Sequence, residues 1–205
     1  MHFVQKVRNV FRGLLQRYGT QAMKRRLWDK EYASGRWSCL EGSGDRTVPA
    51  LVEKYANLGN ILDLGCGPGT TSLQFNPAAY THYTGVDISD VAVEKARSRA
   101  RGKNLAERNQ YLQSDILAFE PSQRYDVILY GDSIYYIPQG QIAPMLTRYS
   151  QFLKSNGVFV ARLFDISGKR HDILDRIQSN FEVAESHTDS DGACLIVFRP
   201  FPVGK

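Results

Sequence analysis

The sequence predicts an α/β fold built on a mostly parallel β-sheet, and three observations carry this prediction. From about residue 46 onward, short apolar runs alternate with stretches of helical periodicity, as a parallel sheet with helical crossovers requires. Several of these runs end in an acidic residue, and the first leads into a turn with three glycines. The last two runs are joined by a short polar loop, which indicates a closing antiparallel pair.

The first strand is predicted at residues 61–64, an apolar run broken only by Asp63. Glycines follow at alternate positions, Gly65, Gly67 and Gly69. They permit a sharp turn and leave the backbone open to a ligand, because no Cβ atom stands in the way. The Thr/Ser-rich segment after them is predicted to open a helix whose free N–H groups point at an anion.

Three further strands are predicted to carry acids at their ends. Residues 82–89 form the second, and Asp87 lies where a βαβ nucleotide fold places the acid that binds ribose hydroxyls. Ser89 is the expected N-cap of a helix that runs to about residue 100. Residues 111–116 form the third strand, with Asp115, and residues 125–132 form the fourth, with Asp132.

The remaining elements follow from periodicity and turn residues. Helices are predicted at residues 46–55, ahead of the first strand, and at residues 139–153, after the fourth. Asn156 and Gly157 are predicted to turn into a fifth strand at residues 158–163. A further helix includes residues 173–177, and residues 181–185 and 193–198 form the expected antiparallel pair.

The first 27 residues carry seven basic side chains and no acid. Apolar residues recur among them at helical spacing, which predicts a basic amphipathic helix. Three roles remain open for this helix. It packs on the domain as a structural helix, or it caps the active site or pairs with a partner subunit. In the third role it lies on an anionic membrane surface or acts as an organelle-targeting sequence. The apolar positions are Phe3, Val7, Val10, Phe11, Leu14, Leu15 and Tyr18.

Size and composition limit the class of protein. The 205 residues suffice for one well-cored domain and a small appendage, and no stretch approaches the length of a membrane span. Cys39, Cys66 and Cys194 have neither metal-site spacing nor a disulfide pattern, so a reducing, cytoplasmic location is expected and no metal site is predicted. Residues 28–205 hold slightly more acids than bases, which gives no electrostatic footprint for nucleic acid.

At the glycine turn and the four strand ends, the chain resembles the class I S-adenosylmethionine-dependent methyltransferases. Their first motif has an acid two residues before a Gly-x-Gly-x-Gly loop, which is the form of Asp63 and residues 65–69. A dinucleotide loop, G-x-G-x-x-G, would place its third glycine one residue later. The resemblance implies a Rossmann-like, mostly parallel seven-stranded sheet with helices on both faces, an antiparallel last strand and an N-terminal helical cap. Residues 1–45 would then be a basic amphipathic helix and cofactor-covering cap, and residues 46–205 the methyltransferase domain.

The resemblance also implies S-adenosyl-L-methionine as cofactor and S-adenosyl-L-homocysteine as product. The three glycines are assigned to the methionine half, Asp87 to the ribose, and Asp115 with Ile116 to the adenine. Asp63 is expected to fix the loop and the amino group of the methionine moiety. The aromatic segment at residues 28–37 either lies over the cofactor or packs a helix onto the sheet edge. The expected cofactor set is Asp63, Gly65, Cys66, Gly67, Gly69, Asp87, Ile88, Asp115, Ile116, Tyr130, Trp28, Tyr32 and Trp37.

On the acceptor side, Asp132 and Tyr135 follow the fourth strand and resemble the Glu-x-x-Tyr-Tyr form of small-molecule and glycan methyltransferases, including the nodulation-factor N-methyltransferase group. The polar-Pro-Pro-aromatic pattern of nucleic-acid base methyltransferases is missing. Asp132 is the candidate base or acceptor-orienting group, or it caps the next helix. His171 follows the fifth strand and is a further catalytic candidate or an exposed loop histidine.

The sequence therefore predicts methyl transfer to an oxygen or nitrogen of a small molecule, such as a sugar, a glycan or another metabolite intermediate. Two alternatives are a protein or RNA methyltransferase that docks through the basic N-terminal helix, and a non-catalytic cofactor-binding module. A nicotinamide-dependent oxidoreductase would instead bind NAD.

Overall fold

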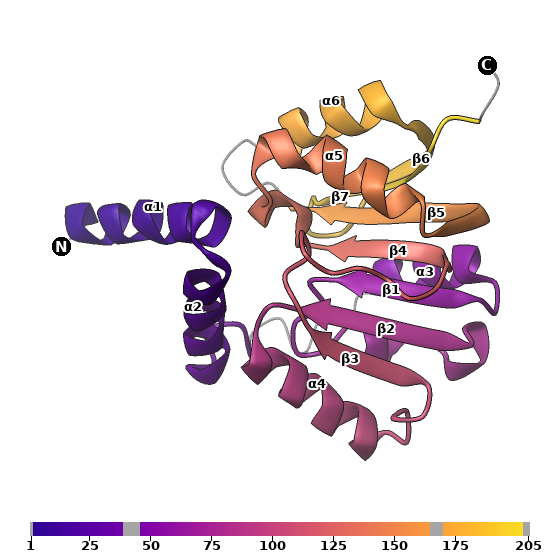
Figure 1. Ribbon diagram of the computed structural model, residues 1–205, viewed down its shortest axis with the longest axis horizontal. Coiled ribbons are helices and arrows are strands. Elements are labelled where there is room, and N and C mark those ends of the chain that lie inside the picture. Colours follow the sequence, from indigo (N-terminus) through magenta and orange to yellow (C-terminus); the bar gives the residue numbers. More distant parts are fainter. Residues whose placement is uncertain (1, 39–45, 165–169, 203–205) are drawn as a thin grey trace.

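The computed structural model describes residues 2–38, 46–164 and 170–202. They form one seven-stranded sheet in the order β3-β2-β1-β4-β5-β7-β6 (Figure 1). The strands are β1 (Asn60–Leu64), β2 (His82–Asp87), β3 (Asn109–Gln113), β4 (Tyr125–Gly131), β5 (Leu153–Leu163), β6 (Glu182–Thr188) and β7 (Cys194–Arg199).

Parallel pairing joins the first five strands, and β7 pairs antiparallel with both β5 and β6. The predicted α/β fold with an antiparallel last strand is thus confirmed. The chain order reverses between β1 and β4, because β1 continues to β2 on one side and β4 lies on the other. Open parallel sheets bind ligands at such a switch point, outside the carboxyl ends of the strands.

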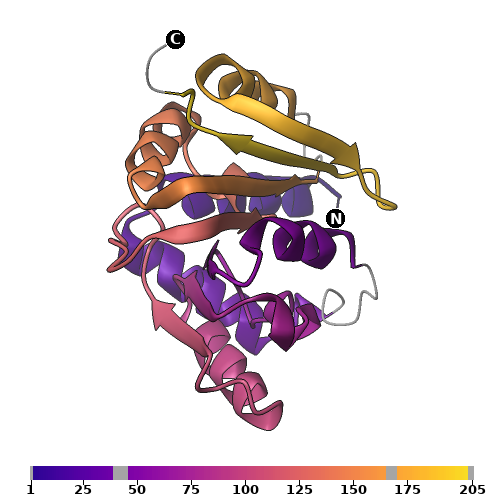
Figure 2. The ribbon, with the colours of Figure 1, turned by 90° about the vertical axis from the view of Figure 1, so that its right-hand side faces the viewer.

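Helices cover both faces of the sheet (Figure 2). One face carries α3 (Thr47–Ala56) and α4 (Asp90–Gly102), whose buried Val52, Val93 and Ala96 pack in one apolar cluster with β1 and β5 residues. The other face carries α5 (Gln139–Ser150) and α6 (Arg170–Asn180), with Leu146 and Ile177 in a second cluster. Burial on both faces explains why the central strands are apolar throughout.

Local signals place most of these elements. The Ser89 hydroxyl accepts a hydrogen bond from the Ala92 N–H, so the predicted N-cap of α4 is confirmed. The helix predicted after the glycine turn is wrong: residues 70–81 contain only two short 3-10 turns, Ser72–Gln74 and Pro77–Ala79. Pro77 interrupts the segment between Gly69 and β2, and a helix ordinarily ends before a proline.

Two boundaries also differ from the prediction. Strand β3 ends at Gln113, so Asp115 lies in the loop beyond it. Asn156 and Gly157 lie within β5, which begins at Leu153 and has an irregular register against β4 between Tyr125 and Val127.

Two N-terminal helices, α1 (His2–Tyr18) and α2 (Gln21–Ala33), lie beyond the carboxyl ends of the central strands, and α1 projects from the body (Figure 1). The predicted N-terminal helix is therefore confirmed. Cys39 falls outside the described residues. Among the helices of the described ranges, none has the length and apolar character needed to cross a bilayer.

The stability of the sheet depends on an aromatic stack between β5 and β7. Phe159 and Phe198 are fully buried, with ring centroids 5.1 Å apart. Replacing Phe198 by alanine is expected to lower the free energy of unfolding by about 3–5 kcal/mol, because it leaves a cavity. Urea unfolding measures the change. The matched control is Phe201→Ala, at a side chain that is 54% exposed, and it should change stability by less than about 0.5 kcal/mol. Equal effects of the two variants would contradict this account of the core.

Candidate active site

A cavity of about 450 Å³ lies at the carboxyl ends of β1, β2 and β4. The glycine turn forms one wall, the loops after β3 and β4 form a second, and the N-terminal helices close the outer side. Its lining includes Gln16, Lys24, Trp28, Tyr32, Trp37, Gly65, Cys66, Gly67, Asp87, Ile88, Asp115, Ile116, Asp132, Ser133, Tyr135, Tyr136, Arg162 and Asp191.

The glycine turn is held by close contacts that leave no room for side chains. Gly65, Gly67 and Gly69 have φ angles of 87°, 52° and 74°, in the left-handed region that favours glycine. A Cβ on Gly65 would lie 2.5 Å from the Cβ of Ser133, and one on Gly67 would lie 2.9 Å from the Tyr32 hydroxyl oxygen. The turn therefore presents bare backbone between the end of β4 and the cap.

Asp87, at the end of β2, ties this turn to the next helix. Its carboxylate accepts hydrogen bonds from the backbone N–H groups of Gly67, at 2.9 Å, and Ser89, at 2.9 Å. Burial nevertheless raises the pKa of Asp87 to about 6, against the lowering effect of these donors. Near neutral pH the group is a buried carboxylate that lines the cavity and can accept further hydrogen bonds.

Asp63 lies beneath the turn, behind the cavity wall. It accepts a hydrogen bond of 2.7 Å from the Tyr83 hydroxyl, and its second oxygen has no partner among the described residues. Burial raises the pKa of Asp63 to about 7, and the Asp87 carboxylate contributes to the increase.

On the far side of the cavity, Asp115 meets a basic residue from the cap. Lys24 Nζ of α2 lies 3.6 Å from the Asp115 carboxylate, and the Leu117 N–H donates to the other oxygen at 2.8 Å. Trp28 packs edge-on against Tyr136, with centroids 4.9 Å apart. The cap thus contacts both the loop after β3 and the turn after β4.

Polar contacts also hold the cap together and bind it to the core. Arg12 of α1 forms an ion pair with buried Glu31 of α2, and Glu31 accepts a further hydrogen bond from the Trp37 indole at 3.0 Å. Arg17 of α1 donates to the backbone oxygen of Tyr135 at 3.0 Å. The rings of residues 28–37 pack on the domain edge, and Trp28, Tyr32 and Trp37 line the cavity; their position over a cofactor stays a prediction.

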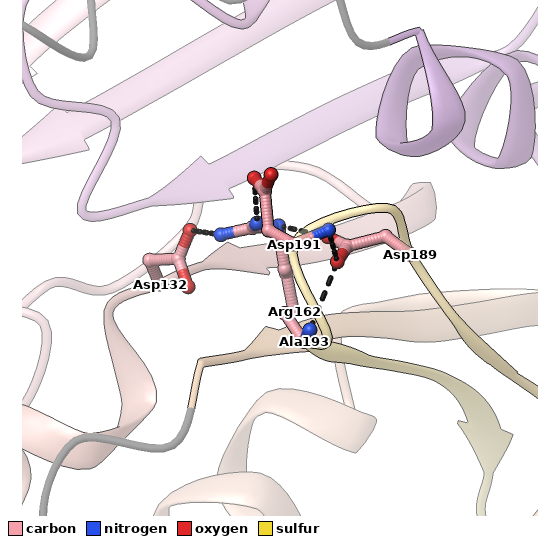
Figure 3. Close-up of polar contacts among 5 residues, drawn as sticks. All are labelled: Asp132, Arg162, Asp189, Asp191 and Ala193. Carbon is pink, nitrogen blue, oxygen red and sulfur yellow. Dashed lines mark hydrogen bonds and ion pairs between the residues drawn. The ribbon is translucent and has the colours of Figure 1, made fainter.

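Beyond β4, Asp132 belongs to an ion-pair cluster centred on Arg162 of β5 (Figure 3). The guanidinium lies 2.5 Å from Asp132, 2.7 Å from the buried Asp189 and 3.1 Å from Asp191. Asp189 also accepts from the Ala193 N–H, so the β6–β7 loop is fixed around it. Three carboxylates around one guanidinium leave the cluster negatively charged, and Arg162 is engaged rather than available for an anionic ligand.

The backbone of Asp132 has a φ of 57°, a conformation that costs a non-glycine residue on the order of 1 kcal/mol or more. Such strain is concentrated at functional sites. The side chain of Asp132 forms no helix cap, since the 3-10 turn at 134–136 has no side-chain cap. Burial raises the pKa of Asp132, with Arg162 opposing the increase, and burial next to Asp132 raises that of Tyr135.

Most of the predicted site residues thus lie together in the lining of one cavity. Four of the predicted site residues, all of them in the described part of the chain, do not line it. Asp63 and Gly69 support the turn from behind, Tyr130 is buried in the sheet core, and His171 is exposed at the start of α6.

Sequence reasoning missed several contributors. Gln16 is 5% exposed, lines the cavity from α1, and its Nε2 has no partner in the described part of the chain. Ser133 donates to the Leu64 carbonyl oxygen at 2.5 Å and so joins the ends of β4 and β1. Asp189 and Asp191 contact Arg162, which lies far from them in the sequence. The sequence signal for these contacts is the acid-rich loop that precedes β7, the strand that pairs with β5 at Arg162.

The cavity fits the cofactor implied by the family resemblance. The bare backbone of Gly65 and Gly67 and the Asp87 carboxylate, to which the resemblance assigns the methionine half and the ribose, line this one cavity. Four acids and two bases occur in the lining, a balance that suits a sulfonium cation.

The buried Asp63 carboxyl generates a prediction about stability. Its folded pKa of about 7 exceeds the ordinary unfolded value, so the stability it contributes is full below about pH 4 and is lost as pH rises to about 7. Asp63→Asn does not titrate. Its stability relative to the wild type should therefore rise from about pH 5 to pH 7, by at most about 1.4 kcal/mol per pH unit. Urea unfolding at several pH values measures the difference, with the exposed Asp175→Asn as control. A difference independent of pH would contradict the assignment.

Comparison with known proteins agrees with this site. The family model described as "Methyltransferase domain" matches residues 61–157. Trans-aconitate 2-methyltransferase of Enterobacter sp. is 30% identical over 131 residues, which are 62% of this chain and 49% of that protein. The chain thus spans about half the length of this curated relative.

Two solved structures share the fold. One is N-methyltransferase NodS from Bradyrhizobium japonicum in complex with S-adenosyl-L-homocysteine, with a TM-score of 0.69 at 18% identity. The superposition covers 87% of this chain and 98% of the NodS chain. The other is the [4+2]-cyclase SpnF, with a TM-score of 0.69 at 16% identity. The superposition covers 89% of this chain and 98% of the SpnF chain. The family match covers the glycine turn and the ends of β1, β2 and β4, so residues 61–157 form a methyltransferase domain, and the chain shares the fold of the class I S-adenosylmethionine-dependent methyltransferases.

Proposed function

We propose that the protein transfers a methyl group from S-adenosyl-L-methionine to a hydroxyl or amino group of a small molecule, such as a sugar, a glycan or another metabolite intermediate. One observation carries the proposal: the bare glycine turn and Asp87 share a cavity with Asp132 and Tyr135. A donor seated on the first pair would face an acceptor bound at the second.

The cofactor supplies an electrophilic methyl group on a sulfonium. Residues 65–67 would bind its methionine half, Asp87 would accept from the ribose hydroxyls, and Asp115 with Ile116 would flank the adenine. Trp28, Tyr32 and Trp37 would cover it and exclude water, which makes residues 1–45 a cap over the domain at 46–205. Holding the methyl donor and the acceptor in line can lower the activation barrier by several kcal/mol, which is on the order of the advantage of intramolecular over bimolecular reactions.

Charge in the acceptor half favours a neutral or cationic acceptor. Arg162 is already contacted by three carboxylates, and Lys24 by Asp115, so neither base of the lining is free for an acceptor carboxylate. Asp132 can accept the proton of a hydroxyl or ammonium group, and its raised pKa strengthens it as a base. Gln16 Nε2 offers a buried donor to the same ligand.

Calorimetry followed by a turnover assay tests the proposal. S-adenosyl-L-homocysteine should bind saturably and NAD should not. Transfer of labelled methyl should then reach low-molecular-weight acceptors from a panel of sugars, amino sugars and polyols. Binding without any transfer would favour a cofactor-binding module. Transfer only to protein or RNA, lost on removing residues 1–27, would favour a macromolecular methyltransferase.

Asp87 should make cofactor binding dependent on pH. Protonation below about pH 6 removes a carboxylate acceptor, so the affinity for S-adenosyl-L-homocysteine should fall as pH decreases, by at most about tenfold per pH unit. Asp87→Asn should weaken binding at about pH 8 by roughly tenfold to a hundredfold, the value of a hydrogen bond to a charged group. Calorimetry between about pH 5 and pH 8 provides both measurements. Asp175→Asn serves as the control, and wild-type affinity in Asp87→Asn would contradict the ribose assignment.

Asp132 should affect turnover more than cofactor affinity. For Asp132→Asn, kcat is expected to fall about 10²- to 10⁴-fold, because a positioned base is lost, while the Kd for S-adenosyl-L-homocysteine changes little. Labelled-methyl transfer and calorimetry measure the two. Asp191→Asn removes another carboxylate from Arg162 and should reduce kcat far less. Equal losses in the two variants would mean that charge around Arg162, not proton transfer to Asp132, limits the rate.

A further inference from the structure

Helix α1 packs on the protein with its apolar side facing outward. Its large apolar side chains are 51% to 65% exposed and lie at helical spacing on one side, and we name them the outer stripe: Val7, Val10, Phe11, Leu14 and Tyr18. An amphipathic helix of a globular domain ordinarily turns this side to the core. The position of α1 therefore leaves its most hydrophobic surface in solvent.

The inner side of α1 is polar and makes the contacts with the protein. Gln16 is buried at the cavity, Arg12 forms an ion pair with Glu31, and Arg17 donates to the Tyr135 carbonyl oxygen. Docking of the cap does not use the outer stripe. Some other apolar environment is needed to explain a stripe of five large side chains on one helix.

Charge decides between a second copy of the chain and a lipid surface. Residues 1–27 contain seven bases and no acid, and α1 itself contains Lys6, Arg8, Arg12 and Arg17. Arg12 and Arg17 are engaged on the inner side, whereas Lys6 is exposed. Two α1 helices packed through their stripes would bring two positively charged segments together, which is unfavourable. Anionic lipid headgroups attract the same positive charge while the stripe enters the boundary with the acyl chains.

We propose that α1 lies on an anionic membrane surface, with the outer stripe buried at the headgroup boundary and the exposed Lys6 near the lipid phosphates. The helix projects from the body, so it can approach a flat surface (Figure 1). Its opposite side borders the cavity through Gln16, which places the cavity about one helix diameter, roughly 10 Å, from the lipid.

Vesicle co-sedimentation of the full chain tests this proposal independently of methyl transfer. The protein should pellet with vesicles of phosphatidylcholine containing roughly a third phosphatidylglycerol, and about tenfold less with phosphatidylcholine alone. The double variant Phe11→Ser/Leu14→Ser should lose about tenfold or more of the binding. Lys6→Gln should lose about fivefold, and raised salt should weaken binding in the wild type.

Phe201→Ser is the matched control, because it removes an exposed aromatic side chain outside α1 and should leave vesicle binding unchanged. Circular dichroism and thermal unfolding should be unchanged in all variants, since the outer stripe makes no core contact. Failure of the wild type to bind anionic vesicles would overturn the proposal. So would equal binding of the stripe variant and the wild type, or a dimer, found by light scattering, that the stripe variant abolishes.

Discussion

The close approach of β1 and β4 at their carboxyl ends is the contact on which the site depends. Ser133 donates to the Leu64 carbonyl oxygen, and its Cβ occupies the space that a side chain at position 65 would need. The turn after β1 is also anchored to β2, because the Gly65 and Cys66 N–H groups both donate to the Val86 oxygen. Three strands therefore determine the path of five residues, and that path exposes bare backbone to the cavity.

The features that the sequence predicts well are those encoded locally. Alternate glycines, apolar runs and the Ser89 cap each act within a few residues, so the strands and the cavity wall with the glycine turn follow from them. The helix expected after the turn was wrong: the segment before β2 contains Pro77 and forms two 3-10 turns. The glycine pattern itself is compatible with either continuation.

Long-range side-chain contacts are what the sequence leaves undetermined. Arg162 forms ion pairs with Asp132, which is 30 residues away in the sequence, and with Asp189, which is 27 residues away. This cluster depends on the register of β5 against β7. Gln16 and Lys24 reach the cavity only because α1 and α2 lie over the strand ends. The sequence does not show which side of α1 its bases face, and Arg12 and Arg17 face the protein.

The two halves of the cavity come from separate stretches of the chain. Residues 61–116 supply the wall with the glycine turn, while the wall with Asp132 comes from residues 131–137 and 162 and the hairpin loop at 189–193. Ser133 belongs to both walls, because it holds the end of β1, whereas Asp189 and Asp191 contact Arg162 on the second wall. Under the proposed function, exchange of this surface hairpin would alter the acceptor side and leave the backbone of the glycine turn in place.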